Sequence, residues 1–532
     1  MEGLYDGYPV RDDIYDEMVA DELGSVRAPY EGMRRMFDNM SIEDLQQRAD
    51  YVSNAYRNQG VTFDIGGEER PFPLDIVPRI IAEDDWAVAE EGVKQRVRAL
   101  EMFLDDIYGA GRCFIDGVIP RHVVTSSRYF YRQAFGIQAH NGVRIHVSGI
   151  DLVRDGNGTF RVLEDNVRIP SGVSYVLTNR RAMGTGMPEL TSSHAVRPVH
   201  DYPQRLLQAL IAAAPGGVSN PTIAVLTPGP YNSAYFEHSL LARMMGCELV
   251  EGRDLVARGG RVMIRTTRGL RPVHVIYRRV DDDFLDPVYF RSDSVLGCAG
   301  ILNAARAGNI TIANAVGNGV ADDKLLYTYV PDLIRYYLHE EPLVPNVDTW
   351  RLEEPDAREE VLDRLNELVV KPVDGSGGKG IVIGPSASAK ELDELRATVL
   401  AKPRGWIAQP VVQLSTVPTM TEQGLRPRHV DLRPFAINSG EDVWVLPGGL
   451  TRVALAEGEL IVNSSQGGGS KDTWVLRGDG RRARYEMRRP TGPIGLSDPQ
   501  VQQRRAVAEK QEQKQPQQQT RTQQTRIEEE PC

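Results

Sequence analysis

The sequence contains only four cysteines, and they lie far apart at positions 113, 247, 298 and 532. Because no CxxC pair occurs, neither a disulfide framework nor a zinc knuckle is expected. No run of eighteen apolar residues is present, and the acidic N-terminus lacks the basic and apolar regions of a secretory signal. We therefore expect a cytoplasmic protein without a membrane partner.

An excess of positive charge is also missing, since the formal net charge is −11. This balance offers no basic surface for a phosphate backbone, so no nucleic-acid partner is expected. The chain does have 532 residues, of which 41% are hydrophobic, and this is enough to bury a large core divided among several structural units.

Changes in composition and periodicity divide the chain into segments. We expect a flexible acidic segment at 1–28, a mainly helical part followed by a hairpin at 29–215, and an α/β unit at 216–315. A helix is predicted to start after Ser41, a favourable capping residue. A section with a glycine-rich loop follows at 316–410, and a strand-rich section at 411–480. Residues 497–532 are rich in glutamine and predict a disordered tail able to recruit a protein partner.

The stretch LVVKPVDGSGGKGIVIG, at 368–384, suggests a phosphate-binding loop. A strand follows the glycines where a dinucleotide fingerprint requires a helix, and the spacing does not match a Walker A loop. The kinase spacing GxGxxGxV occurs, but the other kinase motifs are absent. What remains is a strand, a glycine loop and a second strand, with Lys371 ahead of the loop. Glycines let backbone N–H groups approach phosphate oxygens, although a flexible hairpin turn explains the loop equally well.

A second candidate site lies in the hairpin predicted at 143–167. Glu164 and Asn166 share one strand face, because strand side chains alternate. A turn centred on Gly156 and Asn157 would place Asp151 opposite Val162 and within reach of both. Three oxygen ligands without His or Cys favour magnesium. The alternative is a solvated polar face on a surface hairpin.

Several stretches together resemble the circularly permuted ATP-grasp family (type 2): VLEDNVRIPSGVSYVLTNR, IYRRVDDDFLDP, NAVGNGVADDK, RHVDLRPF, GGLTRVAL and VNSSQGGGSKDTWVL. The mark of the permutation is that the E-x-N motif precedes the glycine loop. The resemblance covers about residues 30–478, and a more distant similarity is to the synthetase module of glutathionylspermidine synthetase.

The resemblance implies a mixed α+β and α/β fold, in which two lobes clamp ATP beside a small Rossmann-like domain at 216–315. The C-lobe would be split between 29–215 and 411–480, and the other lobe would be 316–410. The implied ATP-contacting residues are Lys324, Lys371, the loop residues Asp374, Gly375, Ser376, Gly377, Gly378, Lys379 and Gly380, and the hinge residues Gln409, Pro410 and Val411. Asp151, Glu164 and Asn166 would hold Mg²⁺, and Lys371, Arg433 and Arg168 would be catalytic.

The implied activity is that of an ATP-dependent carboxylate–amine ligase with an acyl-phosphate intermediate, acting on small-molecule or peptide substrates. Two alternatives stay open, an ATP-binding protein without catalysis and a carboxylate kinase without ligation. Arginines suit carboxylate recognition, but Arg168, Arg278 and Arg279 could equally well form structural salt bridges with Asp281, Asp282 and Asp283. The candidate substrate residues are Ser171, Gly172, Tyr231, Asn232, Arg278, Arg279, Gln466 and Lys471.

Overall fold

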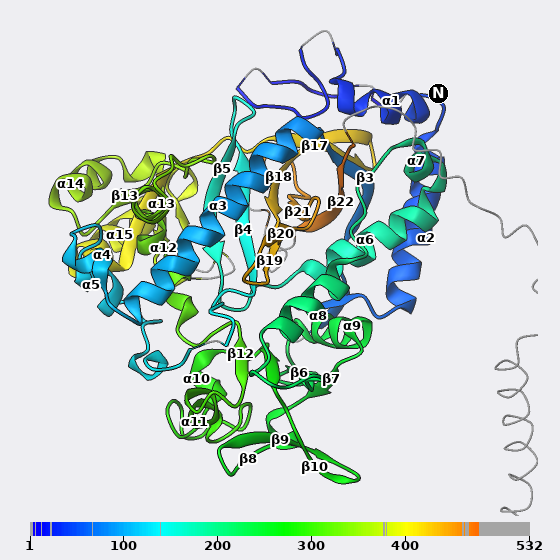
Figure 1. Cartoon of the computed structure of the whole chain (residues 1–532). Coiled ribbons are helices and arrows are strands. Elements are labelled where there is room, and N and C mark those ends of the chain that lie inside the picture. The colour runs from blue at the N-terminus through cyan, green and yellow to red at the C-terminus, as the bar shows by residue number, and fades with distance from the viewer. Residues whose placement is uncertain are drawn as a thin grey trace, which may run out of the picture. The chain divides into compact units, whose positions relative to one another are not determined.

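A nine-stranded sheet carries the hairpin predicted to bind a metal (Figure 1). The computed structural model describes residues 4–5, 7–11, 13–21, 24–65, 68–138, 140–375, 378, 380–459, 462 and 468–477, all within one unit, Met1–Arg481. The sheet's main path runs β20 (Val443–Val445), β19 (Phe435–Asn438), β4 (Val147–Arg154), β18 (Gly424–Arg433), β21 (Leu450–Val453), β22 (Gly469–Val475) and β3 (Leu74–Ile81). In addition, β5 (Phe160–Asn166) pairs with β4, and β17 (Thr416–Thr421) pairs with β18. Only the β22–β3 pair is parallel among these ladders.

Two pairs of helices pack near the ends of this sheet. Helix α2 (Ile42–Asn58) and helix α6 (Val173–Gly186) contact each other, β3 and, for α6, β22. The predicted start of α2 is confirmed, since Ser41 and Asp44 form a reciprocal capping box. Helix α3 (Glu83–Ile107) packs against β20 and α13 (Val330–Leu338), and buries residues spaced three or four apart along its length.

The predicted α/β unit contains a four-stranded parallel sheet. Its order is β12 (Thr311–Ala313), β11 (Val275–Arg278), β6 (Ile223–Leu226) and β7 (Glu248–Val250). Helices α8 (Tyr202–Ala212) and α9 (Tyr235–Met245) pack against this sheet. Strands β8 (Leu255–Arg258), β9 (Arg261–Thr266) and β10 (Gly269–Pro272) form a separate antiparallel sheet.

The glycine-rich segment lies in another four-stranded sheet, ordered β13 (Trp350–Arg351), β16 (Trp406–Pro410), β14 (Leu368–Pro372) and β15 (Val382–Ile383). Strands β14 and β15 pair in antiparallel fashion, so the predicted strand–loop–strand arrangement is confirmed. Helices α14 (Pro355–Asp363) and α15 (Ala389–Ala401) contribute Val361, Leu395 and Val399 to a separate small core with this sheet.

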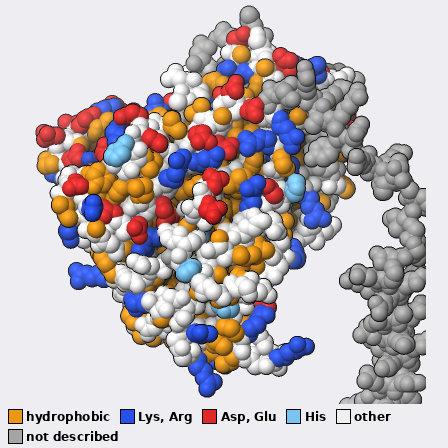
Figure 2. Space-filling model, in the orientation of Figure 1, with side chains coloured by type: hydrophobic (Ala, Val, Ile, Leu, Met, Phe, Trp, Pro, Cys, Tyr) orange, Lys and Arg blue, Asp and Glu red, His pale blue; other side chains and the backbone are white. Residues whose placement is uncertain are grey.

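The remaining elements are short. They are β1 (Thr62–Ile65), β2 (Glu68–Pro71), α1 (Glu31–Phe37), α4 (Arg112–Ile115), α5 (Arg121–Thr125), α7 (Pro188–Ser193), α10 (Asp282–Leu285), α11 (Ile301–Arg306) and α12 (Lys324–Tyr327). In the described ranges, no helix is both long enough and apolar enough to cross a membrane. On the face displayed in Figure 2, basic and acidic side chains are interspersed.

The acidic N-terminal segment differs from expectation, because its described part is packed and not loose. Glu17 is 3% exposed and forms a bidentate ion pair with the buried Arg79 of β3. Asp16 accepts hydrogen bonds from Tyr8 and Thr416, and Met18 beside it is fully buried. Burial of Arg79 without a counter-charge would cost free energy of folding, and Glu17 of the acidic segment supplies that charge. The predicted tail at 497–532 lies outside the described residues.

Candidate active site

The β4–β5 hairpin brings the predicted metal ligands together, but in a register different from the predicted one. Asp151 pairs with Glu164, where Val162 was expected, and Arg154 pairs with Phe160. The reason is a wider turn and a bulge, since Leu152 pairs with Val162 and Leu163 is the extra residue. Asp151 and Glu164 are therefore direct cross-strand partners.

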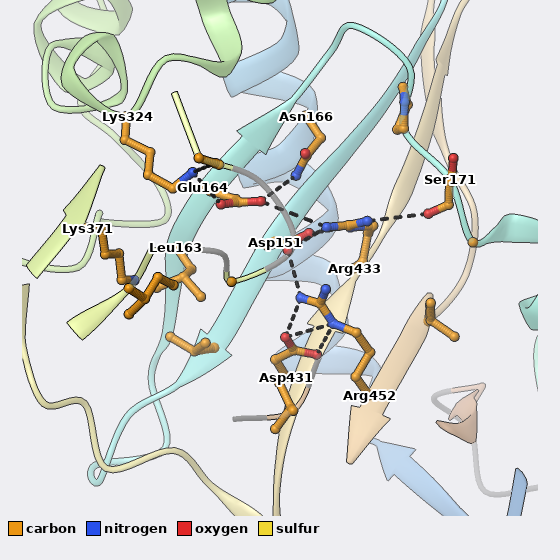
Figure 3. Close-up of a pocket in the computed structure, with 18 of the residues that line it drawn as sticks. Asp151, Leu163, Glu164, Asn166, Ser171, Lys324, Lys371, Asp431, Arg433 and Arg452 are labelled. Carbon is orange, nitrogen blue, oxygen red and sulfur yellow. Dashed lines mark hydrogen bonds and ion pairs between the residues drawn. The ribbon is translucent and has the colours of Figure 1, made fainter. Parts of the chain in front are cut away.

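These side chains face a cavity of about 590 Å³ that is lined by the nine-stranded sheet and by the β13–β16 sheet (Figure 3). The lining residues from the hairpin are Asp151, Glu164 and Asn166. Opposite them, the cavity is lined by Lys371, Gly375, Gly378, Gln409, Pro410 and Val411. Three segments remote in sequence, the hairpin, Lys324 and the β14–β16 strands, therefore meet at one cavity.

Two lysines enter the cavity from different elements. Lys324 begins α12, and its Nζ lies 3.2 Å from Glu164 Oε2 and donates to the carbonyl of Gly375. Lys371 extends from β14 and donates to Gln409 Oε1 at 2.6 Å. Burial lowers the pKa of Lys371 to about 8, although the nearby Glu164 carboxylate opposes this shift.

A row of alternating charges crosses strands β18, β4 and β21. Arg433 donates from Nε and Nη2 to the two oxygens of Asp151, and Arg452 Nη2 donates to Asp151 Oδ2 at 2.8 Å. Arg452 Nε also lies 3.0 Å from both oxygens of Asp431. Burial opposes ionisation of Asp151, but the two arginines outweigh it and hold the pKa of Asp151 below its ordinary value. The row holds Asp151 as a carboxylate.

The hairpin side chains fit a hard divalent cation. The described residues hold no cluster of three or more His, Cys, Asp or Glu that suits a metal, so the donor set depends on the amide of Asn166. Asn166 Nδ2 donates to Glu164 Oε1 at 3.2 Å, which leaves its oxygen without a partner among the described residues. Two carboxylates and one amide oxygen are ligands that suit Mg²⁺, which completes its shell with water and phosphate oxygens.

Part of the glycine-rich loop can be placed. Gly375 and Gly378 line the cavity, whereas the side chain of Asp374 and Gly380 do not. Gly378 and Gly380 have φ of 77° and 78°, a conformation that favours glycine. The predicted ATP contacts at Ser376, Gly377 and Lys379 lie outside the described residues.

Beyond Asp151 the cavity extends to the loop that follows β5. Ser171 and Gly172, both predicted substrate residues, line this end together with Glu237, Ser233 and Ala234. The buried Glu237 carboxylate fixes the loop, because its Oε2 accepts hydrogen bonds from the backbone of Gly172, at 2.7 Å, and from Ser174. Ser171 and Gly172 therefore line the cavity in a loop that Glu237 holds in place.

The two arginines of the YRR motif are structural. Arg278 is fully buried and pairs with Asp282, as the salt-bridge alternative predicted. Arg279 is 4% exposed, pairs with Glu237 and donates to Ser171 Oγ at 2.6 Å. Neither lines the cavity.

Other predicted site residues are also placed elsewhere. Lys471 is fully buried, and its ammonium lies 2.6 Å from the carboxylate of Asp75. The two residues are neighbours across the β22–β3 ladder. Tyr231 is 99% exposed, and neither it nor Asn232 lines the cavity, whereas the following Ser233 and Ala234 do. Gln466 lies outside the described residues.

Arg168 is the one predicted catalytic residue that does not line the cavity. Its Nη1 lies 2.9 Å from Asp281 Oδ1, and its Nε lies 3.7 Å from Asp322 Oδ2. These carboxylates hold the guanidinium, and the contact with Asp281 is one that the salt-bridge alternative predicted. The catalytic role of Arg168 stays a prediction.

Sequence reasoning missed Asp431, Arg452 and Glu237. Asp431 and Arg433 alternate on β18, and Arg452 is the direct cross-strand partner of Asp431. The sequences of β18 and β21 contain Asp431 and Arg452, but their ion pair becomes visible only when the two strands are paired. Nothing in the sequence around Glu237 indicates its role, because its partners lie in a loop that is distant in sequence.

Comparisons with known proteins identify the family of the chain. A family model described as "Circularly permuted ATP-grasp type 2" matches residues 78–454. The chain belongs to the circularly permuted ATP-grasp family. An uncharacterized protein of Mycobacterium tuberculosis is 60% identical over 478 residues, which cover 89% of this chain and 87% of that one. A protein of Frankia alni named "Putative glutamate--cysteine ligase 2-3" is 46% identical over 87% of this chain, which spans only 54% of that relative.

The fold of the family is also found in a solved structure, that of a glutathione synthetase-like effector from Globodera pallida. The TM-score is 0.56 at 12% sequence identity, and the match covers 82% of this chain and 98% of the other. The predicted fold class, a circularly permuted ATP-grasp fold, is confirmed.

Proposed function

We propose that this ATP-grasp protein is an ATP-dependent carboxylate–amine ligase that works through an acyl phosphate. The observation that carries the proposal is the meeting of Lys324, Lys371, Asp151, Glu164 and Asn166 at one cavity. Support also comes from the Frankia relative, because a glutamate–cysteine ligase joins a carboxylate to an amine.

In this proposal ATP lies between β14–β16 and the β4–β5 hairpin. The strand segment from Gln409 to Val411 borders the adenine, while Lys324 and Lys371 meet the phosphates with their ammonium groups. Gly375 and Gly378 present backbone close to the phosphate oxygens, where a Cβ would stand in the way. Phosphoryl transfer depends on this kind of positioning and charge neutralisation, and it needs no covalent nucleophile from the protein.

Asp151, Glu164 and Asn166 would hold Mg²⁺, which supplies charge neutralisation at the phosphate oxygens when bound. Arg433, oriented by Asp151, faces the space between the hairpin and Ser171 (Figure 3). We assign it to the phosphoryl group in transfer, because a guanidinium matches the geometry of phosphate oxygens.

The reaction would proceed in two steps. A carboxylate oxygen of the substrate attacks the γ-phosphorus, the bond to the β,γ-bridging oxygen breaks, and ADP leaves. An amine then attacks the acyl carbon, phosphate leaves with the carbon–oxygen bond pair, and the amine nitrogen loses a proton. The substrates are a small-molecule or peptide carboxylate and an amine, bound at the end of the cavity near Ser171 and Gly172.

The test is incubation with ATP, Mg²⁺ and a metabolite extract, followed by mass spectrometry for new amide-linked products and assay of ADP. Wild-type protein is expected to form both, and Lys371→Ala neither, since loss of a well-placed charge at a transferring group costs about 10²- to 10³-fold in rate. Hydroxylamine added to the mixture should trap the acyl group as a hydroxamate. A hydroxamate without any amide product would show a kinase, and ATP binding without ADP release in any extract would show a binding protein.

A further inference from the structure

Tyr129 connects the segment that follows α5 with the first residue of the glycine-rich loop. Its hydroxyl donates to the carbonyl of Asp374 at 3.0 Å, and the side chain is nearly buried, with 7% of the residue exposed. Burial raises the pKa of Tyr129, so the phenol remains protonated at neutral pH and remains a donor. Nothing in the proposed chemistry uses this hydroxyl.

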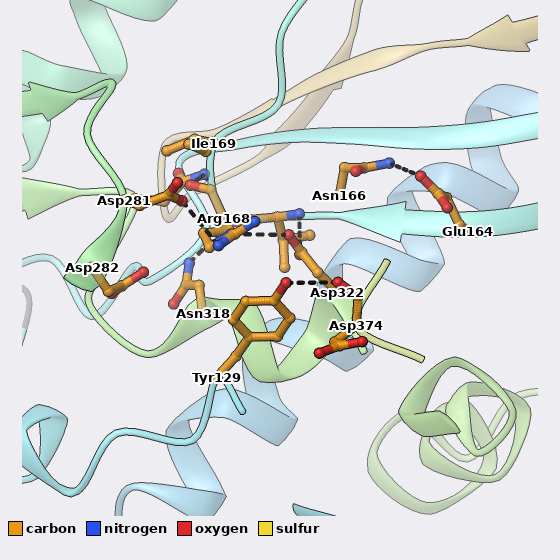
Figure 4. A network of polar contacts seen from close by, with 12 residues as sticks. Tyr129, Glu164, Asn166, Arg168, Ile169, Asp281, Asp282, Asn318, Asp322 and Asp374 are labelled. Carbon is orange, nitrogen blue, oxygen red and sulfur yellow. Dashed lines mark hydrogen bonds and ion pairs between the residues drawn. The ribbon is translucent and has the colours of Figure 1, made fainter. Parts of the chain in front are cut away.

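The ring of Tyr129 rests on Arg168 (Figure 4). The guanidinium carbon lies 4.5 Å from the ring centroid, within the range of a cation–π contact. Gly319 permits this packing, because a Cβ at that position would lie 3.0 Å from both Tyr129 Cβ and Arg168 Cδ. Asp281 and Asp322 hold Arg168 in place from its other sides.

Arg168 is itself tied to the metal-binding hairpin. It follows the end of β5 by two positions, and Asp322 Oδ1 accepts a hydrogen bond from the backbone of Val167 at 2.7 Å. Two residues after Asp322, Lys324 donates to the carbonyl of Gly375. The successive carbonyls of Asp374 and Gly375 are therefore both held by groups that are anchored at the end of the hairpin.

We propose that Tyr129, supported by Arg168, is a positioning residue that fixes the start of the phosphate-binding loop relative to the metal-binding hairpin. The inference rests on the ATP-binding part of the proposed function and needs no knowledge of the carboxylate or the amine. A tyrosine with only a packing role would need its ring but not its hydroxyl. Removal of the hydroxyl alone therefore separates the two roles.

The experiment compares Tyr129→Phe with wild type in binding of ATP and of AMP, in the presence of Mg²⁺, by calorimetry. One hydrogen bond of this kind is worth about a threefold to tenfold change in equilibrium, so the Kd for ATP should rise by that factor. The Kd for AMP should stay unchanged, because AMP lacks the phosphates that the loop meets. Tyr56→Phe is the matched control, since Tyr56 also donates a buried hydrogen bond, to Asn179, far from the loop in sequence.

Gly319→Ala is the second variant, and it keeps both side chains while forcing them apart. It should weaken ATP binding more than AMP binding, as Tyr129→Phe does. Unchanged ATP binding in Tyr129→Phe would overturn the inference, and so would equal weakening of ATP and AMP binding with a fall in Tm no different from that of Tyr56→Phe. If wild type binds ATP but never forms an amide, the ligase proposal fails and the role of Tyr129 can still be measured.

Discussion

Raising the pH above about 8 should remove the charge of Lys371. Burial lowers the pKa of this ammonium to about 8 from the ordinary 10.5, and the proposed contact with the ATP phosphates needs the protonated form. About half of the molecules are protonated at this pKa and about one in ten at one pH unit above it, so the Kd for ATP should rise about fivefold between pH 8 and pH 9. The assay is a series of calorimetric titrations with ATP and Mg²⁺ from pH 6.5 to pH 9.5.

Lys371→Arg is the decisive control, because a guanidinium keeps its proton over this whole range. Its affinity for ATP should be weaker at pH 7 but almost constant up to pH 9.5. A wild-type Kd that is flat to pH 9.5, or an equal rise in Lys371→Arg, would refute the role given to this ammonium.

The same shift has a consequence for stability in the absence of nucleotide. Because the folded-state pKa lies below the unfolded value of 10.5, the folded chain binds fewer protons between pH 8 and pH 10.5. The charged side chain thus destabilises the folded state below pH 8, and this cost is relieved as the pH rises toward 10.5. Lys371→Met should therefore unfold at a higher urea concentration than wild type at pH 7, and a lower midpoint would contradict the burial argument.

Three further outcomes are expected. Glu164→Gln should weaken Mn²⁺ binding in the presence of ATP by at least about tenfold, measured by electron paramagnetic resonance, whereas unchanged binding would remove this carboxylate from the metal site. Gly172→Ala should lower the free energy of unfolding by about 1–3 kcal/mol in urea, because φ is 117° and the new Cβ would lie 2.8 Å from Leu450 Cδ2. Gly458→Ala, at φ of 71° with open space around it, should cost less, and equal costs would disprove the steric contribution. Lys471→Met should destabilise the fold but leave the Kd for ATP unchanged in the folded fraction, and selective loss of ATP binding would return this lysine to the site.

Local sequence patterns predicted the strands, loop and helix start around the site better than they predicted the side-chain contacts between these elements. The strand–glycine loop–strand unit and the start of α2 after Ser41 follow from residue types within a few positions, and both are confirmed. The convergence of Asp151, Glu164 and Asn166 was predicted even though the register was wrong, because Glu164 and Asn166 alternate whatever the turn length. A bulge at Leu163 leaves no local mark in the sequence.

Long-range pairing explains the errors. Arg278 and Lys471 look like substrate contacts in their motifs, but buried partners at Asp282 and Asp75 occupy them. Such pairs become visible only when distant strands and loops are placed next to one another. Sequence reasoning identified charged residues that matter, and the three-dimensional partners decide which of them are free to meet a ligand.

The alternating row of Arg433, Asp151, Arg452 and Asp431 has a consequence for how this protein can change over time. Asp151 and Asp431 are buried, and the arginines compensate their charges, so loss of one arginine leaves a buried carboxylate with less counter-charge. Descendants of a common ancestor that lack Arg452 should then also lack the acid at position 431, and the two sites should be inherited as a pair.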